Sequence, residues 1–329
     1  MSKTVTYSKS CTLILTTYCS NNCSYCGFKN NNHGLITDSE VRKLLTFAKS
    51  TGHWEILVMS GENAGLSLRI KKQLHNRGYS DYIHFVSSMC KLILDHGLLP
   101  HTNIGVLKYD ELKRLHNVNA SMGLMIEDIN KELGRRIHPE KNIAERLRVI
   151  EDAGKLKIPF TSGIIMGLGE TQKDRMESIK VLLRLHARYN HIQEIILQNF
   201  VPNRNSKIKQ TSTVSIDDYN ELIELISKHS DIAVQIPQNL NSYFKNLILN
   251  GANDLGGISK GKDQINPQKP WGNITSLKRE LKSSGISLQP RLPIYSKYIK
   301  MGWYTPELEP VLMKLLSLKT FSHNIIARN

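Results

Sequence analysis

The chain has 329 residues, of which 40% are hydrophobic and 22% charged, a composition that excludes a disordered or fibrous protein. A net charge of +15 is compatible with a polyanionic partner such as RNA. About half of the excess lies after residue 260, however, without a dense run of Lys or Arg. We interpret it as a solvated basic surface, so a nucleic-acid partner is not expected.

The start of the chain lacks the apolar core of a secretory signal, and no stretch approaches the roughly 18 apolar residues that a membrane helix needs. Three of the five cysteines fall in one short motif, an arrangement that does not favour a disulfide framework. These features predict a cytoplasmic protein with no membrane partner.

Short apolar runs alternate with amphipathic segments along most of the chain, as β-strands followed by helices do. The predicted strands cover residues 12–16, 54–59, 98–102, 119–126, 159–166, 192–200, 232–236 and 255–258. The predicted helices cover residues 37–50, where Thr37 and Glu40 form a capping box, and residues 80–96, 108–115, 141–154, 171–189, 216–229 and 239–250. Eight such units in about 260 residues predict an α/β fold, a parallel (β/α)8 barrel of TIM type.

No segment rich in Pro, Gly or Ser divides the chain. We assign residues 1–259 to the barrel and residues 260–329 to a C-terminal extension that closes and packs on it. The sequence of this extension is less regular, with Pro267, Pro270, Pro290 and Pro293, and two helices are predicted in it, at residues 273–284 and 306–317.

The most distinctive segment follows the first predicted strand and carries Cys19, Cys23 and Cys26 within eight residues. Three thiols spaced in this way on one loop can hold an iron–sulfur cluster. A structural zinc site needs four ligands and would have to recruit Cys11 or Cys90. Cys11 lies roughly 16 Å from the loop along an extended strand. Cys90 falls on the apolar face of a predicted helix, so zinc is the weaker alternative.

Further polar and glycine residues follow the predicted strands, where a barrel places its chemistry. Gly61 and Glu62 follow the second strand, and a carboxylate there can accept hydrogen bonds from an ammonium group. Ser121 and Glu127 lie on the fourth predicted strand, and Arg146 lies on the helix after it. These three side chains offer acceptors and a cation for a zwitterionic amino acid moiety, or alternatively form an ordinary salt bridge.

The Cys-x3-Cys-x2-Cys spacing, with an aromatic residue before the last cysteine, resembles the signature of the radical S-adenosylmethionine (SAM) enzymes. The resemblance implies that Cys19, Cys23 and Cys26 hold a [4Fe-4S] cluster whose open iron binds SAM. It also implies that an electron from a one-electron donor cleaves SAM to methionine and a 5′-deoxyadenosyl radical. The residues that it implies for SAM binding are Tyr25, Phe28, Gly61, Glu62, Ser121, Glu127, Arg146 and Gly167.

Longer blocks of the sequence are similar to the CofG family, whose members are one subunit of 7,8-didemethyl-8-hydroxy-5-deazariboflavin synthase. They cover residues 98–103, 118–125, 158–163, 198–200 and 254–259, within a resemblance that extends from about Tyr7 to Tyr298. The resemblance implies closure of the deazaflavin ring with release of ammonia. The substrate would be an adduct of a tyrosine-derived hydroxybenzyl group and a ribityl-aminouracil, supplied by a partner radical SAM enzyme, CofH.

Some loops depart from that family's pattern, at residues 63–64, 203–205, 238 and 272. The alternatives are a divergent relative that acts on another aromatic adduct and, less favoured, an RNA-modifying radical SAM enzyme. A small-molecule substrate with hydroxyls, amides and carbonyls needs polar side chains that donate and accept hydrogen bonds. The candidates, at the ends of the third, sixth and eighth predicted strands, are His101, Asn103, Gln198, Asn199 and Asp254.

Overall fold

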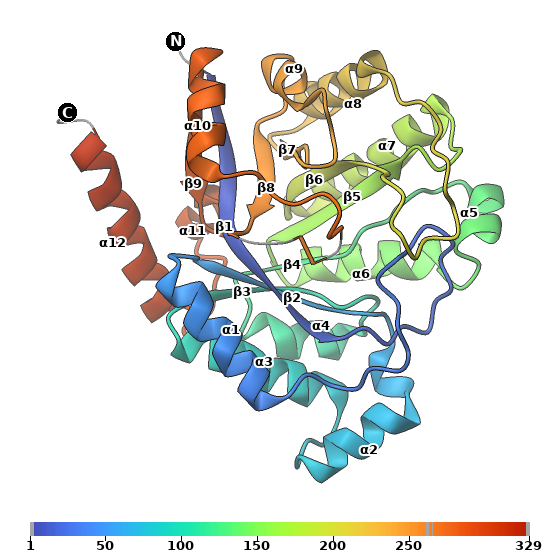
Figure 1. Cartoon of the computed structure of the whole chain (residues 1–329), viewed down its shortest axis with the longest axis vertical. Helices are drawn as coiled ribbons and strands as arrows, with labels where there is room; N and C mark the ends of the chain where they lie inside the picture. The colour runs from blue at the N-terminus through green and yellow to red at the C-terminus, as the bar shows by residue number, and fades with distance from the viewer. Residues whose placement is uncertain (1–2, 261–262, 265, 327–329) are drawn as a thin grey trace.

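The computed structural model describes residues 3–260, 263–264 and 266–326. Within these residues nine parallel strands form one sheet in the order β2-β3-β4-β5-β6-β7-β8-β1-β9. An additional pairing of β1 with β2 closes the first eight strands into a barrel, which helices surround (Figure 1). The predicted (β/α)8 barrel of TIM type is therefore confirmed.

The strands and helices alternate along the chain as a barrel of this type requires. The strands are β1 (Lys3–Thr16), β2 (Glu55–Ser60), β3 (Leu99–Asn103), β4 (Ser121–Gly123), β5 (Phe160–Met166), β6 (Ile192–Asn199), β7 (Ala233–Gln235), β8 (Asp254–Ile258) and β9 (Ile286–Arg291). The helices are α1 (Asp38–Ser50), η1 (Ala64–Leu66), α2 (Leu68–Asn76), α3 (Tyr82–Asp95), α4 (Tyr109–His116), α5 (Lys131–Ile137), α6 (Ile143–Lys155), α7 (Gln172–Tyr189), α8 (Ile216–His229), α9 (Phe244–Leu249), α10 (Ile274–Ser283), α11 (Ser296–Lys300) and α12 (Glu309–Ile326).

The helix boundaries follow local capping chemistry. At the start of α1, Thr37 Oγ1 accepts from the Glu40 amide at 3.3 Å and the Thr37 amide donates to Glu40 Oε2 at 2.9 Å. This reciprocal pair is the capping box that the sequence predicts, and it satisfies two amides that the helix leaves unpaired.

Strand β1 is long enough, at 14 residues, to have two neighbours along one edge. Its second half pairs with β2, with Ser10 opposite Glu55, and its first half pairs with β9, with Lys3 opposite Ile286. β9 therefore extends the sheet past the amino-terminal end of β2. The predicted strand 12–16 is too short, since β1 begins at Lys3.

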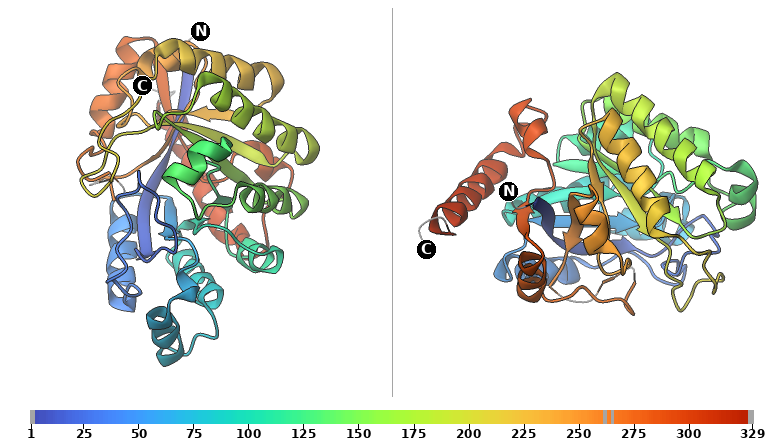
Figure 2. Two further views of the ribbon diagram at one scale, coloured as in Figure 1. Left: turned by 90° about the vertical axis from the view of Figure 1, so that its right-hand side faces the viewer. Right: turned by 90° about the horizontal axis from the view of Figure 1, so that it is seen from above.

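The chain after β9 covers the amino-terminal end of the barrel. Its apolar side chains form a cluster with Trp54, Leu99 and Ala120. Leu99 is the first residue of β3, and Trp54 and Ala120 directly precede β2 and β4. In the view from above, α12 lies at the periphery of the barrel (Figure 2). The described part of residues 260–329 thus contributes β9 to the sheet and packs on the barrel, while the division of domains at residue 259 stays a prediction.

Several other elements differ from their predictions. β4 covers only Ser121–Gly123 rather than residues 119–126, although the amides of Leu124 and Ile126 still donate to β5 and Glu127, whose φ is +66°, forms an isolated bridge with Ile164. The short helices α2, α5 and α11 and the strand β9 were not predicted, and α9 is shorter than expected. α12 begins at Glu309, three residues later than predicted, and continues to Ile326.

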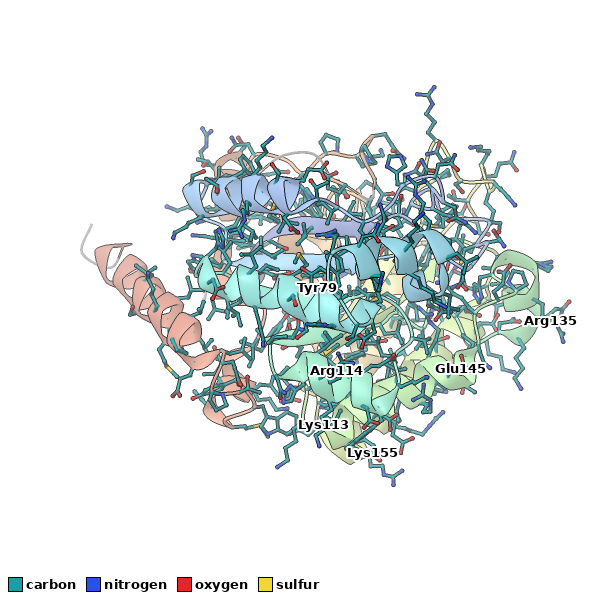
Figure 3. The ribbon with its side chains drawn as sticks, turned by 90° about the horizontal axis from the view of Figure 1, so that it is seen from below. Tyr79, Lys113, Arg114, Arg135, Glu145 and Lys155 are labelled. Carbon is teal, nitrogen blue, oxygen red and sulfur yellow. The ribbon has the colours of Figure 1, made fainter. Side chains whose placement is uncertain are left out.

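The outer surface carries charges of both signs. Lys113, Arg114, Arg135, Glu145 and Lys155 are exposed and project from the surrounding helices (Figure 3). Such a mixed surface agrees with the interpretation of the net charge as solvated. None of the described helices is both long and apolar enough to cross a membrane.

Candidate active site

The loop after β1 carries the three clustered cysteines and lies against the carboxyl end of β2. The Ser20 amide donates to the Glu62 carbonyl at 3.0 Å, and the Glu62 amide lies 3.3 Å from Cys19 Sγ. A Cβ atom on Gly61 would stand 2.0 Å from the Tyr18 carbonyl oxygen. Only glycine permits this approach, so Gly61 fixes the distance between the cysteine loop and the end of β2.

Two further segments hold the same loop from other sides. The Ser24 amide donates to the Ile137 carbonyl of α5 at 2.7 Å, and the Lys207 amide donates to the Ser24 carbonyl at 2.8 Å. The Phe28 amide lies 3.4 Å from Cys26 Sγ, which orients the last turn of the loop. The loop is therefore built from contacts between segments far apart in the sequence.

The three thiols of this loop are half-buried. Burial raises the pKa of Cys23 to about 11, and the nearby Glu127 and Cys26 act in the same direction, while Lys141 opposes them. A thiolate here is therefore unfavourable until a bound metal cluster supplies positive charge. In the described part of the chain, no three His, Cys, Asp or Glu side chains are close enough together to share a single metal ion.

The other two cysteines lie away from the loop. Cys11 is buried on β1 opposite Ile56. Cys90 is buried on α3, where its thiol contacts Thr102 Oγ1 at 3.6 Å and an amide group of Asn119. Neither is positioned to give the loop the fourth thiol that the zinc alternative requires.

A buried charged group stands beside the cysteine loop. Arg146 Nη1 of α6 binds Glu62 Oε2 at 2.6 Å, and its Nη2 lies 4.0 Å from Glu127 Oε1. Lys141 Nζ binds Glu127 Oε1 at 2.5 Å and donates to the Tyr25 hydroxyl at 2.8 Å. The structure thus joins four predicted residues, and it adds Lys141, which no local sequence motif marks.

The side chain of Glu127 has the features of a ligand-binding residue. Its burial opposes ionisation, but the charges of Lys141 and Arg146 lower the pKa of its carboxyl group. Its Oε2 atom is buried and accepts no hydrogen bond from any described residue. It also occupies left-handed backbone, a strained conformation for a non-glycine residue. An unused buried acceptor on an ionised carboxylate fits a bound hydroxyl or ammonium group.

An apolar wall completes this end of the barrel. Tyr25, Leu133, Ile137, Leu168 and Phe200 form one buried cluster, and Cys23 and Cys26 pack against it. This wall suits a flat ring, while the charged group suits a zwitterion. The residues present therefore fit a [4Fe-4S] cluster and SAM. Gly167 stands close by in sequence, at φ +102°, with its amide donating to Glu170 Oε1 at 2.7 Å.

Three predicted site residues lie outside the two groups described above. Ser121 is fully buried, and its hydroxyl donates to the Pro293 carbonyl at 2.8 Å rather than lying with Glu127. Asn199 ends β6 at the predicted end of the barrel, but it donates to the Leu240 carbonyl at 3.1 Å and does not line the barrel cavity. Asp254 begins β8, so it lies at the amino-terminal end of the barrel, and its placement at the barrel mouth was wrong.

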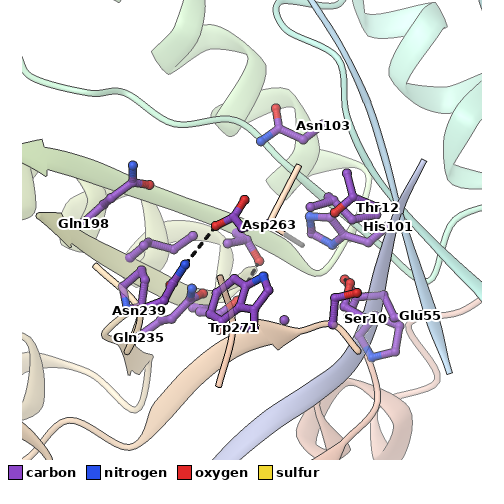
Figure 4. Close-up of a pocket in the computed structure, with 18 of the residues that line it drawn as sticks. Ser10, Thr12, Glu55, His101, Asn103, Gln198, Gln235, Asn239, Asp263 and Trp271 are labelled. Atoms are coloured by element: carbon purple, nitrogen blue, oxygen red, sulfur yellow. Dashed lines mark hydrogen bonds between the residues drawn. The ribbon is translucent and has the colours of Figure 1, made fainter. Parts of the chain in front are cut away.

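A cavity of about 190 Å³ occupies the barrel interior (Figure 4). The predicted residues His101, Asn103 and Gln198 line it. Met125 also lines it, and the Met125 carbonyl accepts from Arg146 Nε at 2.7 Å. The cavity therefore adjoins the charged group beside the cysteine loop. Sequence reasoning missed other lining residues, among them Glu55, Glu194, Gln235, Asn239, Trp271 and Arg291.

The amino-terminal end of this cavity is closed by an ion-pair network. Arg291 binds Glu194 Oε1 and Asp254 Oδ2, both at 2.6 Å, and Tyr295 donates to Asp254 at 2.9 Å. Burial raises the pKa of Glu194 to about 8, with the Arg291 charge opposing it and Asp254 and Glu55 acting with burial. Burial acts against ionisation of Asp254 as well, but Arg291 outweighs it and lowers the Asp254 pKa. Near neutral pH the coupled pair of carboxyl groups therefore holds one proton between them.

Known proteins resemble this chain in sequence. Residues 13–182 match the model of the radical SAM superfamily. The chain is 38% identical over 316 residues to 7,8-didemethyl-8-hydroxy-5-deazariboflavin synthase of Archaeoglobus fulgidus, covering 95% of this chain and 97% of that protein. It is 42% identical over 316 residues to the protein of the same name from Methanococcus maripaludis, covering 92% and 94%.

Solved structures resemble it in fold. The hydrogenase maturase HydG from Carboxydothermus hydrogenoformans aligns with a TM-score of 0.69 and 17% identity, over 87% of this chain and 67% of that one. Methylornithine synthase (PylB) aligns with a TM-score of 0.66 and 17% identity, over 86% and 83%. At such low identity these likenesses show a shared barrel fold.

Proposed function

Because this chain belongs to the 7,8-didemethyl-8-hydroxy-5-deazariboflavin synthase family of radical SAM enzymes, we propose that it closes the deazaflavin ring. The substrate is an adduct of a tyrosine-derived hydroxybenzyl group and a ribityl-aminouracil, and ammonia leaves. A partner radical SAM enzyme, CofH, supplies the adduct. The observation that carries the proposal is the polar barrel cavity. Through Met125 it adjoins the buried charged side chains of Glu62, Glu127, Lys141 and Arg146, called the Arg146 group below.

The cofactors implied by the family have candidate ligands in this chain. Cys19, Cys23 and Cys26 would hold the [4Fe-4S] cluster, and Glu62, Glu127 and Arg146 would bind SAM, with Tyr25, Phe28 and Gly167 near its adenosine. When bound and supplied with an electron by a one-electron donor, these cofactors would provide the radical chemistry that removes hydrogen from the substrate.

The protein's own groups position the reactants. Glu127 Oε2 is free to accept a hydrogen bond from SAM, and Lys141 holds the Tyr25 ring in place through its hydroxyl. On the substrate side, Asn103 and Gln198 line the cavity toward the carboxyl ends of β3 and β6, and Trp271 lines it from the segment after β8. These groups keep the substrate within reach of the Arg146 group.

The direct test is turnover of the adduct by anaerobically reconstituted enzyme with SAM and a reductant, followed by mass spectrometry. We expect the deazaflavin chromophore and ammonia in equal amounts. If the enzyme with a complete cluster cleaves SAM yet leaves the adduct unchanged, the proposed substrate is wrong. The divergent relative that acts on another aromatic adduct then takes its place.

The Glu127→Gln variant tests the cofactor site. Losing the charge on this acceptor should weaken SAM binding by about 1.5–3 kcal/mol, roughly 10- to 150-fold, as for a hydrogen bond to a charged group. Iron content should stay at the wild-type value. Calorimetric titration with SAM measures the effect, and the exposed Glu145→Gln on α6 is the matched control. Unchanged SAM affinity would mean that Glu127 is only a structural ion-pair partner.

A further inference from the structure

The barrel cavity contains a buried carboxylate with unused acceptor capacity. Glu55 is 6% exposed and lines the cavity at the start of β2. Its oxygens accept hydrogen bonds from the hydroxyls of Ser8 and Ser10, and no described Lys, Arg or His forms an ion pair with it. A carboxylate has about four acceptor positions, and burying it with so few donors is costly. Further donors are therefore expected from a ligand.

Other side chains along the same cavity also present acceptors. Asn239 Oδ1 is buried and has no hydrogen-bond donor among the described residues. The hydroxyl of Ser121 donates to the Pro293 carbonyl, so its 2.7 Å contact with His101 Nδ1 requires Nδ1 to be the donor. That tautomer leaves His101 Nε2 as an acceptor. Burial lowers the His101 pKa, which keeps the ring neutral.

The geometry of the cavity is that of a closed well. Glu194 and Gln198 line it from one strand, four residues apart, which corresponds to a depth of about 13 Å. Arg291 and the Pro293 segment close its lower end, where Glu55 stands. Figure 4 shows Asn103 and Gln198 apart from the Ser10 and Glu55 pair. A ligand part that reaches the lower end must therefore extend about 13 Å below the rim of the barrel.

We propose that the lower end of the barrel cavity, with Glu55 as its main acceptor, is the subsite for the ribityl chain of the substrate. This inference rests on the proposed function, which supplies a substrate with such a chain. A polyol chain is narrow, and each of its hydroxyls donates one hydrogen bond, which matches a well lined by unused acceptors. The fused rings then remain at the upper end, beside Met125 and the Arg146 group.

The experiment compares two probes on the reconstituted enzyme with SAM and without reductant. One probe is the ribityl-aminouracil, and the other is the same aminouracil with a methyl group in place of the ribityl chain. Calorimetry should show at least tenfold tighter binding of the ribityl compound to the wild type. Glu55→Gln should weaken binding of the ribityl compound by about tenfold and leave binding of the methyl compound unchanged. Glu145→Gln should change neither.

A second variant keeps the subsite testable if the Glu55→Gln protein does not fold. His101→Leu removes the neutral acceptor that lies beside Ser10 and Glu55 (Figure 4), and it should weaken binding of the ribityl compound severalfold without affecting binding of the methyl compound. The subsite is wrong if the wild type binds the two probes with equal affinity. It is also wrong if Glu55→Gln weakens binding of both probes equally. Either result leaves the proposed function intact. If neither probe binds, the subsite fails, and the proposed function is decided separately by turnover of the adduct. Because the probes share the amino group and the uracil ring, the comparison isolates the hydroxyls from an amine that Glu55 could also bind.

Discussion

Replacement of Cys23 by Ala is expected to remove the iron–sulfur cluster, so that iron falls from about four atoms per chain to nearly none after anaerobic reconstitution. Cys23 is the middle thiol of the loop and packs against the Tyr25 cluster, where no other described cysteine can replace it. Two remaining thiolates cannot hold a cluster that needs three protein ligands. SAM cleavage should be lost together with the iron.

Iron and sulfide content and the visible absorption spectrum measure this result. Cys90→Ala is the matched control, because Cys90 is buried on α3 beside Thr102 and its loss removes a thiol without touching the loop. The control should retain about four iron atoms, and both variants should keep the circular dichroism of a folded barrel. Full iron content in Cys23→Ala would refute the assignment of the loop as the cluster site.

The barrel could be predicted from sequence because short, largely buried runs with several aliphatic residues alternate with amphipathic segments. β5 and β6, for example, are mostly buried although β6 also carries polar residues toward the cavity. The first half of β1 escaped prediction because its inner face carries Ser8 and Ser10, which bind Glu55 inside the barrel. A strand with a polar inner face resembles a surface segment until its neighbours are known. β9 escaped for a similar reason, since it contains Pro290 and pairs with residues almost 300 positions away.

Some residues of the candidate site could likewise be predicted from the sequence, and others could not. The cysteine loop and the Gly61-Glu62 turn carry local spacing that sequence alone can show. Lys141 and Arg291 carry no such signal, because their partners Glu127 and Asp254 meet them only through tertiary structure. Asp254 was misplaced because its residue type suggested a binding side chain, whereas its position at the start of β8 puts it at the opposite end of the barrel.

Replacement of Arg291 by Met is expected to lower the free energy of unfolding by about 3–5 kcal/mol, the usual effect of removing one partner from a buried ion pair. Arg291 is 7% exposed, and it is the cation that binds both Glu194 and Asp254. Without it, the protein must bury an uncompensated charge or keep both carboxyl groups protonated. Urea denaturation at pH 7.5 measures the loss, and the exposed Arg279→Met is the matched control.

The pH dependence of this loss separates the ion pair from simple packing. In the wild type, Arg291 lowers the Asp254 pKa, so Asp254 stabilises the fold above its ordinary pKa near 3.8 and this contribution disappears as the pH falls below it. In Arg291→Met, burial without a cation should raise both carboxyl pKa values, so the variant loses stability as the pH rises. The gap between the two proteins should therefore narrow from pH 7.5 to pH 5. Adding Asp254→Asn to the variant should restore part of the stability, because it removes the unpaired charge. A loss below about 1 kcal/mol, or a gap that does not change with pH, would show that Arg291 does not hold these carboxylates together.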